Sequence, residues 1–359
     1  MKVLYLINYA GSGGSERYVE LLARYYHGSK AQCGLCYNLG GPLVEKMKEL
    51  GIPVYQLPMK SPLDLSAAKK LAKLCREEGY DVIHAQYPRE NDIAILSKNF
   101  GCKAKVVFTS HLIMEQPPLW RILNRIFTPK NHAVLTVCTY GRQVLERGGV
   151  AKDKIRIVFN GVDAAAAPPR DRSVLQEFGI ADDEKVITIL TRFSEEKGVP
   201  FLLRAIARLK ERTSIPFRLL LVGTGPDFDR DQELVPQLGI QDRVVLTGFR
   251  SDTARLLAAS DIYLNSSSSE AMSFAILEAM GAGLPLVLTE VGGNPELVNT
   301  GAVSGLLVPY GDEEGYADAI RQLLEDDALR SRFAAASRAK AGTEFDLYHL
   351  LDQLFEIYQ

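Results

Sequence analysis

Cysteine is scarce in this 359-residue sequence, and long apolar runs are absent from it. The five cysteines are odd in number and scattered through apolar stretches, which favours reduced, buried thiols over a disulfide framework. Cys33 and Cys36 form one C-x-x-C pair, but no second pair completes a zinc site, so both are expected in the core of a strand. No run approaches the ~20 apolar residues of a transmembrane helix, and the N-terminal apolar stretch is too short for a signal peptide. We therefore expect a cytoplasmic protein.

An excess of charge of one sign is also lacking. The formal net charge is -2 at pH 7, so no global basic field argues for a nucleic-acid partner. The composition, 47% hydrophobic and 24% charged, is ordinary for a globular protein. The length exceeds what one hydrophobic core usually supports, which predicts two domains.

Complete nucleotide-binding fingerprints are missing as well. The pattern G-x-x-x-x-G-K-[ST] of a P-loop does not occur. NYAGSGGSER (residues 8–17) and LVGTGPDFD (residues 221–229) each include the end of a strand, yet neither has the third glycine of a dinucleotide site, which argues against a dehydrogenase. The glycines of the first stretch can still bring backbone close to a ligand, and the helix that begins near Ser15 offers N–H groups to an anion. A turn that needs glycine for its geometry alone is the alternative.

Short apolar, β-rich runs alternate with helical patterns along the whole chain. Runs of this type indicate parallel strands joined by crossover helices and covered on both faces. The alternation restarts after NGVDAAAAPPR, residues 160–170, where an alanine run and two prolines interrupt it. The sequence therefore predicts an α/β fold of two Rossmann-like, doubly wound domains with a cleft between them. Expected strands include 3–8, 82–85, 106–110, 133–137, 186–190, 218–223 and 261–265; expected helices include 15–26, 66–78, 91–99, 141–147 and an amphipathic helix in the final FDLYHLLDQLFEIYQ.

TRFSEEKG, residues 191–198, follows the strand VITIL and places two cations at its carboxyl end. Ligands of doubly wound sheets bind at this edge. The guanidinium of Arg192 and the ammonium of Lys197 suit the oxygens of a diphosphate. The alternative is a solvated loop in which these cations pair with Glu195 and Glu196.

EAMSFAILE, residues 270–278, carries two carboxylates in a run that is otherwise small or apolar. On one continuous helix Glu270 and Glu278 would lie roughly 12 Å apart, too far for two carboxylates that act on one glycosidic bond. A helix that starts near Ser273 would instead offer the N–H groups of Ser273, Phe274 and Ala275 to a phosphate. The two carboxylates would then bind hydroxyls on either side of that phosphate.

These motifs occur with others in a fixed order: GGSE (13–16), FTSH (108–111), NGVD (160–163), VGTGP (222–226), EAMGAGLPLV (278–287), VGGNPELV (291–298) and GLLVPYGD (305–312). In this combination the sequence resembles the family 4 retaining glycosyltransferases, which have the GT-B fold. The resemblance covers most of the chain and is strongest in its second half. It implies that residues 1–166 form an acceptor-binding domain, that 167–342 bind the nucleotide-sugar donor, and that 343–359 form a helix crossing back to the first domain.

The resemblance also implies roles for single residues. Arg192 and Lys197 would bind the donor diphosphate, Glu278 the ribose hydroxyls and Glu270 the transferred sugar. His111 matches the family's histidine near the sugar and the acceptor. Backbone at Gly13 and Gly14 would close over the phosphates, and backbone near Phe249 and Arg250 would face the base.

The residues that we expect at the site fall into three sets. Catalysis would involve His111, Arg192, Lys197 and Glu270. The donor would contact Gly13, Gly14, Asn160, Arg192, Lys197, Gly223, Phe249, Arg250, Glu270, Ser273, Phe274, Ala275 and Glu278. The acceptor side would contain Ser15, Glu16, His111, Trp120, Arg121 and Arg125.

The implied reaction is transfer from a nucleotide-diphosphate sugar, with a UDP-sugar favoured, to a glycan or lipid-linked acceptor, with retention at the anomeric carbon. Preorganised cations and helix N–H groups would stabilise the leaving diphosphate, and that phosphate would assist deprotonation of the acceptor. No protein nucleophile, metal or other cofactor is then expected, since no D-x-D is placed for a nucleotide-bound cation. A nucleotide-sugar-binding protein that has lost transfer and a nucleotide-sugar epimerase are the alternatives.

Two positions depart from the family pattern. Thr191 stands where the family generally has glycine, and Ala271-Met272-Ser273 replaces its glycine-rich turn. Added β-carbons restrict positive φ in that turn. These departures bear on the identity of the donor sugar more than on the reaction class.

PLWRILNRIF, residues 118–127, is a helical pattern with Trp120, Leu123 and Phe127 on one face and Arg121 and Arg125 beside it. Such a segment can lie on an anionic membrane surface, which would place the protein at the inner face of the membrane. The alternative is an ordinary helix with a core face and solvated arginines.

Overall fold

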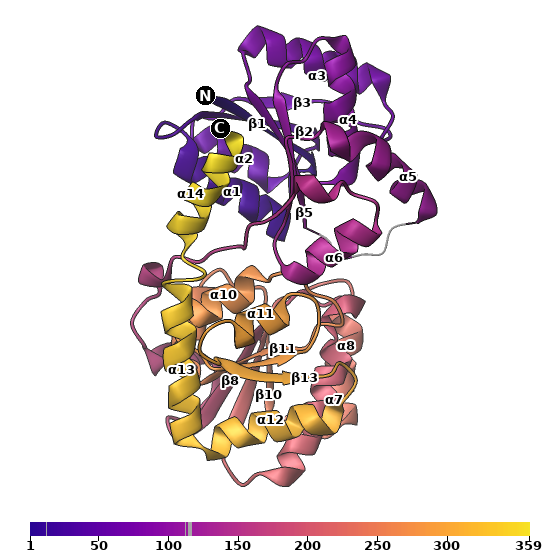
Figure 1. Cartoon of the computed structure of the whole chain (residues 1–359). Coiled ribbons are helices and arrows are strands. Elements are labelled where there is room, and N and C mark those ends of the chain that lie inside the picture. The colour runs from indigo at the N-terminus through magenta and orange to yellow at the C-terminus, as the bar shows by residue number, and fades with distance from the viewer. Residues whose placement is uncertain (12, 112, 114–116) are drawn as a thin grey trace. The chain divides into compact units, whose positions relative to one another are not determined.

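The computed structural model describes residues 1–11, 13–111, 113 and 117–359. The chain divides into two compact units, Met1–Phe159 with His349–Gln359, and Asn160–Tyr348. Each unit is built on a parallel β-sheet with helices on both sides of it (Figure 1). This arrangement confirms the predicted pair of Rossmann-like α/β domains.

The first unit contains, within its described residues, a seven-stranded parallel sheet in the order β3-β2-β1-β4-β5-β6-β7. Helices cover both faces of this sheet, so that Val3 to Ile7 of the central strand β1 are fully buried. The strands are β1 (Lys2–Tyr9), β2 (Gln32–Leu39), β3 (Val54–Gln56), β4 (Val82–Ala85), β5 (Lys105–Ser110), β6 (Ala133–Thr136) and β7 (Ile155–Ile157). The helices are α1 (Gly14–Tyr26), α2 (Pro42–Glu49), α3 (Leu65–Glu78), α4 (Pro88–Ser97), α5 (Pro118–Phe127), α6 (Thr139–Arg147) and α14 (Leu347–Tyr358).

Two differences from the sequence prediction in this unit have simple physical reasons. The edge strand β3 has three residues with half-exposed or exposed side chains, so it lacks an apolar run that would signal a strand. Helix α4 begins at Pro88, before the predicted residue 91, because proline is compatible with the first helical turn. Cys33 and Cys36 are buried, reduced thiols of β2, as predicted.

The second unit contains a six-stranded parallel sheet in its described residues, in the order β10-β9-β8-β11-β12-β13. Its strands are β8 (Lys185–Leu190), β9 (Phe217–Val222), β10 (Val244–Gly248), β11 (Ile262–Asn265), β12 (Leu286–Thr289) and β13 (Gly305–Val308). Its helices are α7 (Val199–Arg212), α8 (Phe228–Gln237), α9 (Thr253–Ala259), α10 (Phe274–Gly281), α11 (Asn294–Asn299), α12 (Glu313–Glu325) and α13 (Asp327–Ala341). Helices α7 and α12 pack with the central strands in one large apolar cluster, which includes Ile187, Leu202 and Ile320.

The C-terminal helix α14 packs its apolar face on the first unit, beside α1 (Figure 1). The Tyr26 hydroxyl of α1 donates a hydrogen bond to the Leu351 carbonyl, and the rings of Tyr26 and Phe355 lie 5.3 Å apart. The Tyr358 hydroxyl lies 2.7 Å from Nδ1 of the buried His84, whose Nε2 lies 2.7 Å from the Thr109 hydroxyl. His84 is therefore a structural residue between α14 and β5.

Acid should destabilise the protein through His84. Burial, reinforced by His111, lowers the pKa of His84 to about 3, whereas a histidine in an unfolded chain has a pKa near about 6.5. Below about pH 6.5 the unfolded chain therefore binds a proton that the native imidazole does not. The free energy of unfolding then decreases as the pH is lowered, until the native ring also takes up a proton. We expect His84→Gln to make the slope of unfolding free energy against pH shallower by about 1.4 kcal/mol per pH unit over this window.

Urea unfolding at a series of pH values measures this slope. Gln237→Ala changes an exposed side chain of α8 that does not titrate, and it should keep the wild-type slope. An unchanged slope in His84→Gln would mean that His84 titrates alike in the folded and unfolded chains.

The alanine run between the two sheets has a packing role. Ala164–Ala166 forms a short 3-10 turn, and the Asp163 carboxylate accepts a hydrogen bond from the Ala165 N–H. A β-carbon added at Gly281 of α10 would lie 3.6 Å from the Ala164 Cα, so small residues allow this turn to lie close to α10.

In the described part of the chain, no helix is both long and apolar enough to cross a membrane.

Candidate active site

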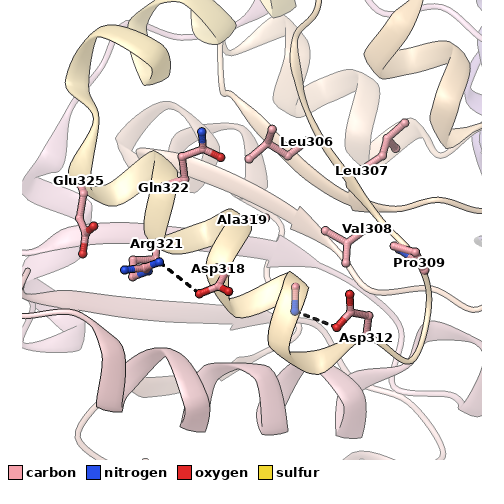
Figure 2. A pocket seen from close by; sticks show the side chains of 11 residues that line it. Leu306, Leu307, Val308, Pro309, Asp312, Asp318, Ala319, Arg321, Gln322 and Glu325 are labelled. Atoms are coloured by element: carbon pink, nitrogen blue, oxygen red, sulfur yellow. Dashed lines mark hydrogen bonds and ion pairs between the residues drawn. The ribbon is translucent and has the colours of Figure 1, made fainter.

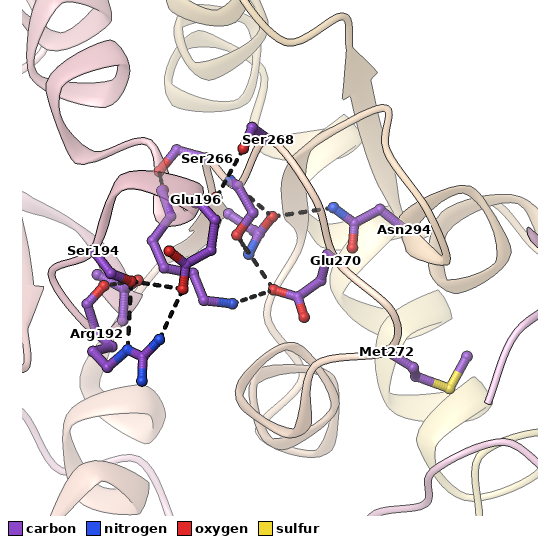
Figure 3. A network of polar contacts seen from close by, with 12 residues as sticks. Arg192, Ser194, Glu196, Ser266, Ser268, Glu270, Met272 and Asn294 are labelled. Carbon is purple, nitrogen blue, oxygen red and sulfur yellow. Dashed lines mark hydrogen bonds and ion pairs between the residues drawn. The ribbon is translucent and has the colours of Figure 1, made fainter. Parts of the chain in front are cut away.

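The loop after β8 is anchored against the loop after β11, and this contact fixes Lys197. Gly198 has φ +63°, and an added β-carbon would lie 2.2 Å from the Ser266 carbonyl oxygen, so only glycine fits there. The Ser266 hydroxyl donates to the Lys197 carbonyl at 2.8 Å. The Lys197 ammonium is thereby directed to Glu270, with Nζ 2.7 Å from Oε2 (Figure 3).

Glu270 is held by three separate groups. Its carboxylate accepts hydrogen bonds from Lys197 and, at 3.3 Å, from the Ser267 hydroxyl. Its backbone carbonyl accepts a bond from the Gly293 N–H at 3.1 Å. The Lys197 and Glu270 side chains are only 24% and 11% exposed, so this ion pair is better defined than one on an open surface.

Arg192 and Lys197 follow the same strand, but their side chains bind different carboxylates. The Arg192 guanidinium lies 2.9 Å from Glu196 Oε1, and the side chain is 67% exposed. Burial disfavours ionisation of Glu196, but hydrogen bonds from Ser194 and Arg192 outweigh it and lower the pKa of that carboxyl. The solvated pairing considered for this loop therefore occurs at Arg192, whereas Lys197 pairs with the second carboxylate motif.

The EAMSFAILE segment forms the predicted loop and helix start. Ser273 is the N-cap of α10, and its side chain does not cap the helix, so the first N–H groups point out of the helix without a side-chain acceptor from the cap. Glu278 lies in the second turn of α10. Burial raises the pKa of the Tyr263 phenol, and the charges of Glu278 and Glu270 raise it further, so both carboxylates lie within electrostatic reach of one tyrosine.

The turn that departs from the family pattern is built without strained backbone. None of the described non-glycine residues has a positive φ, so Ala271 to Ser273 and Thr191 adopt ordinary conformations. Asn160 Nδ2 donates to the Met272 carbonyl at 2.9 Å and supports this turn from the linker. The Asn160 side chain is therefore placed to shape the loop between the two carboxylates.

Glycines of the two predicted ligand loops differ in what they contact. Gly223 has φ +136°, and an added β-carbon would lie 1.9 Å from the Thr191 carbonyl oxygen. Gly223 is thus required for packing between neighbouring loops, whatever else it does. An added β-carbon at Gly14, the first residue of α1, would meet none of the described atoms within 4 Å, whereas at Gly13 it would meet Glu16 Oε2 at 2.8 Å.

A second polar cluster lies at the carboxyl edge of the first sheet. Ser15 Oγ donates to Glu16 Oε2 at 2.9 Å and lies 2.6 Å from the Tyr87 hydroxyl. His111 Nε2 lies 2.9 Å from Gln86 Oε1. The structure therefore joins the predicted Ser15, Glu16 and His111 to Gln86 and Tyr87, which sequence reasoning missed although both directly follow the strand VIHA.

The remaining predicted residues lie at more exposed positions. Phe249 is 78% exposed, and the Arg250 guanidinium binds the carboxylates of Glu177 and Asp252. The predicted backbone contact of these residues with a base stays a prediction.

Helix α5 has the core face and the solvated arginines of the alternative interpretation, with Leu123 and Phe127 on the core side. Phe127 is buried and Leu123 packs against the core, because this stripe faces the protein. The exposed apolar residues are Leu119, Ile122 and Ile126, at 65%, 56% and 52% exposure. Trp120 is half-buried, and the two predicted arginines of this helix are exposed.

Two further observations concern other kinds of site. A hollow of about 530 Å³ lies between β13 and α12, and its polar lining includes Asp312, Asp318 and Arg321 (Figure 2). None of the predicted site residues lines it. Within the described ranges, no group of three or more histidine, cysteine or acidic side chains is arranged to hold a metal ion.

Comparisons with known proteins agree with this arrangement. Residues 171–340 match the model of "Glycosyl transferases group 1", and residues 12–166 match that of "Glycosyltransferase Family 4". The chain is 33% identical over 315 residues to N-acetyl-alpha-D-glucosaminyl L-malate synthase of Bacillus anthracis, covering 85% of this chain and 80% of the relative. It is 32% identical over 207 residues to the lipopolysaccharide core biosynthesis glycosyltransferase LpsD of Rhizobium meliloti, covering 58% of each.

Solved structures have the same fold. Anabaena Alr3699/HepE in complex with UDP matches with a TM-score of 0.86 over 99% of both chains, at 24% sequence identity. The predicted GT-B fold is confirmed by this likeness.

Proposed function

Because this chain belongs to the group 1 glycosyltransferases of family 4, we propose that it transfers a sugar from a UDP-sugar to a hydroxyl of a glycan or lipid-linked acceptor. The anomeric configuration is retained, and no metal ion takes part. One observation carries the donor half of this proposal. Lys197, Glu270, the start of α10 and Glu278 are brought together at the carboxyl edge of the second sheet.

Each of these groups suits one part of a nucleotide-diphosphate sugar. The α10 N–H groups and the Lys197 ammonium stabilise the charge that grows on the diphosphate as the bond from sugar to phosphate breaks. Glu270 accepts hydrogen bonds from sugar hydroxyls, and Glu278 accepts them from the ribose. The leaving phosphate takes the proton of the acceptor hydroxyl as the new glycosidic bond forms. Arg192 reaches the diphosphate by exchanging its exposed partner Glu196.

The identities of donor and acceptor draw support from the relatives. The structure of HepE was solved with UDP and with UDP-glucose, which supports a uridine donor here. The name of LpsD specifies lipopolysaccharide core biosynthesis, which supports a glycan or lipid-linked acceptor.

A donor screen tests the proposal most directly. Nucleotide sugars that bind the native state should raise the thermal unfolding midpoint, because ligand binding stabilises by mass action. The best donor is then incubated with acceptor glycans, with and without EDTA, and the anomeric configuration of the product is read by NMR. Transfer with retention in EDTA is expected. Binding without turnover would favour a nucleotide-sugar-binding protein, and isomerised donor without acceptor would favour an epimerase.

We also propose that α5 contacts an anionic membrane surface on the cytoplasmic side. Its exposed Leu119, Ile122 and Ile126 offer apolar side chains, and the exposed Arg121 and Arg125 add positive charge. Each arginine near an anionic bilayer contributes about 1 kcal/mol. This combination of exposed apolar and cationic side chains favours an interfacial contact.

Charge reversal of these arginines should abolish that contact. We expect the full chain to float with liposomes that contain anionic lipid and to lose this association in Arg121→Glu/Arg125→Glu. The loss is expected because two favourable charges become two repulsive ones. The control Lys69→Glu/Lys73→Glu changes two exposed lysines of α3 and should float like wild type. Equal flotation of both variants, or none by wild type at low salt, would contradict the proposal.

A further inference from the structure

We propose that Gln86 is a positioning residue that holds His111 as the neutral imidazole with its proton on Nε2, so that Nδ1 accepts a hydrogen bond from a substrate hydroxyl. The assignment of the proton concerns the protein alone. The role of Nδ1 toward substrate rests on the proposed glycosyltransferase function.

The orientation of the Gln86 amide is fixed by a group that can only accept. Gln86 is fully buried directly after β4, and its Nε2 lies 3.1 Å from the backbone carbonyl oxygen of His84. A carbonyl oxygen cannot donate, so the amide NH2 must face His84. The amide oxygen Oε1 then faces His111. The reversed amide would place two acceptors against each other and leave a buried oxygen unpaired.

The orientation of the amide in turn fixes the imidazole. His111 Nε2 lies 2.9 Å from Gln86 Oε1, and because that oxygen only accepts, the hydrogen must be on Nε2. A neutral imidazole has one N–H, so Nδ1 carries the lone pair. The rings of Tyr18 and His111 pack in an edge-to-face arrangement with their centroids 5.0 Å apart, and this contact restricts rotation of the imidazole.

The surroundings of His111 favour the neutral ring. Burial lowers the pKa of His111 to about 4. The rings of Tyr18 and Tyr87 lie beside His111, and burial raises the pKa of both phenols, so neither is anionic near neutral pH. Burial also keeps the imidazole of His84 neutral, and the Glu16 carboxylate of the same cluster accepts its hydrogen bond from Ser15. At pH 7 the ring is therefore an acceptor of hydrogen bonds at Nδ1 and not a cation.

This state of the ring limits what His111 can recognise. A hydroxyl of the sugar or of the acceptor can donate to Nδ1, whereas a phosphate or carboxylate oxygen, which only accepts, would meet a lone pair. His111 would therefore select a hydroxyl of its ligand and not a phosphate oxygen.

Nitrogen NMR of the full chain tests the protonation state without any assumption about activity. The protein is labelled with 15N in its histidine rings, and long-range proton–nitrogen spectra are recorded near neutral pH. The His111 signals are identified by their loss in His111→Asn. We expect a single tautomer with protonated Nε2 and unprotonated Nδ1. A proton on Nδ1, a protonated ring or an even mixture of tautomers would overturn the proposal.

Variants of Gln86 test its positioning role. In Gln86→Glu a carboxylate faces Nε2–H and stabilises the imidazolium, so the midpoint of His111 titration should rise by about 1–3 pH units. The acid limb of kcat/KM should move by the same amount, because only the neutral ring accepts through Nδ1. In Gln86→Met the Nε2–H loses its partner, and kcat should fall about tenfold with little change in donor Kd.

The control separates this role from packing. Thr128→Val removes a buried hydroxyl that donates to the Asn124 carbonyl and accepts from the Ala151 N–H. It should lower stability but leave the pH profile of kcat/KM unchanged. An unmoved titration and pH profile in Gln86→Glu would make Gln86 a packing residue only. Wild-type protein with the expected tautomer but no turnover would refute the proposed transferase and leave the Gln86 assignment standing.

Discussion

Replacing Lys197 by alanine is expected to lower kcat/KM by about 100-fold to 1000-fold, the effect of removing one preorganised group that stabilises developing negative charge. Lys197 is held by Glu270 at 2.7 Å and by a loop that only Gly198 permits, so its charge is in position before any substrate binds. The loss should appear mainly in kcat, because the charge on the diphosphate grows as the bond to the sugar breaks.

Two controls make this result specific. Lys210→Ala removes a half-exposed lysine of α7 that pairs with Asp242, and it should keep wild-type kinetics. Lys197→Arg keeps the charge but not the shape, so it should recover part of the lost activity. Steady-state kinetics with the best donor provide the measurement. Wild-type kcat/KM in a folded Lys197→Ala protein would remove Lys197 from the site.

Replacing Glu278 by glutamine is expected to weaken donor binding by at least tenfold in Kd. Each hydrogen bond from a ribose hydroxyl to the carboxylate is worth about 1.5–3 kcal/mol, and the amide keeps the shape of the side chain without its charge. Isothermal titration calorimetry with UDP gives the Kd directly. Glu314→Gln, at an exposed position of α12 that pairs with Arg208, is the matched control and should bind UDP like wild type.

A modified ligand identifies the contact itself. UDP without its ribose 2′ and 3′ hydroxyls should bind wild type as weakly as UDP binds Glu278→Gln. When the two changes are combined, their losses of binding free energy should not add. Full additivity would mean that Glu278 acts on another part of the donor, and unchanged affinity in Glu278→Gln would refute the assignment.

The sequence predicted the part of this protein that depends on local pattern. Continuous apolar runs such as Val3–Ile7 became strands buried on both faces, and the amphipathic C-terminal segment became α14. The start of α10 near Ser273 also followed from the sequence, because a polar turn precedes a run of helix-forming residues. The short edge strand β3 could not be predicted, since its two half-exposed residues and one exposed residue carry no periodic signal.

The candidate site shows a similar division. The strand-end rule located Lys197 and Glu270, because parallel strands present their carboxyl ends at one edge. His111 was assigned through the resemblance to the family. It did not select Gln86, which has no charge and belongs to no motif. Nor could it assign the α5 face, because the stripe with Phe127 and the stripe with Ile122 both satisfy helical spacing.

By itself, the sequence determined the class of fold, the family and the edge of each sheet where ligands are expected, since these depend on hydrophobic periodicity and on motif order. Only the tertiary structure decided which partner each polar group has. It paired Lys197 with Glu270 and Arg192 with Glu196, and it turned the Gln86 oxygen toward His111. The physical reason is that hydrogen bonds and ion pairs act over a few ångströms, so they depend on which loops meet in space and not on distance along the chain.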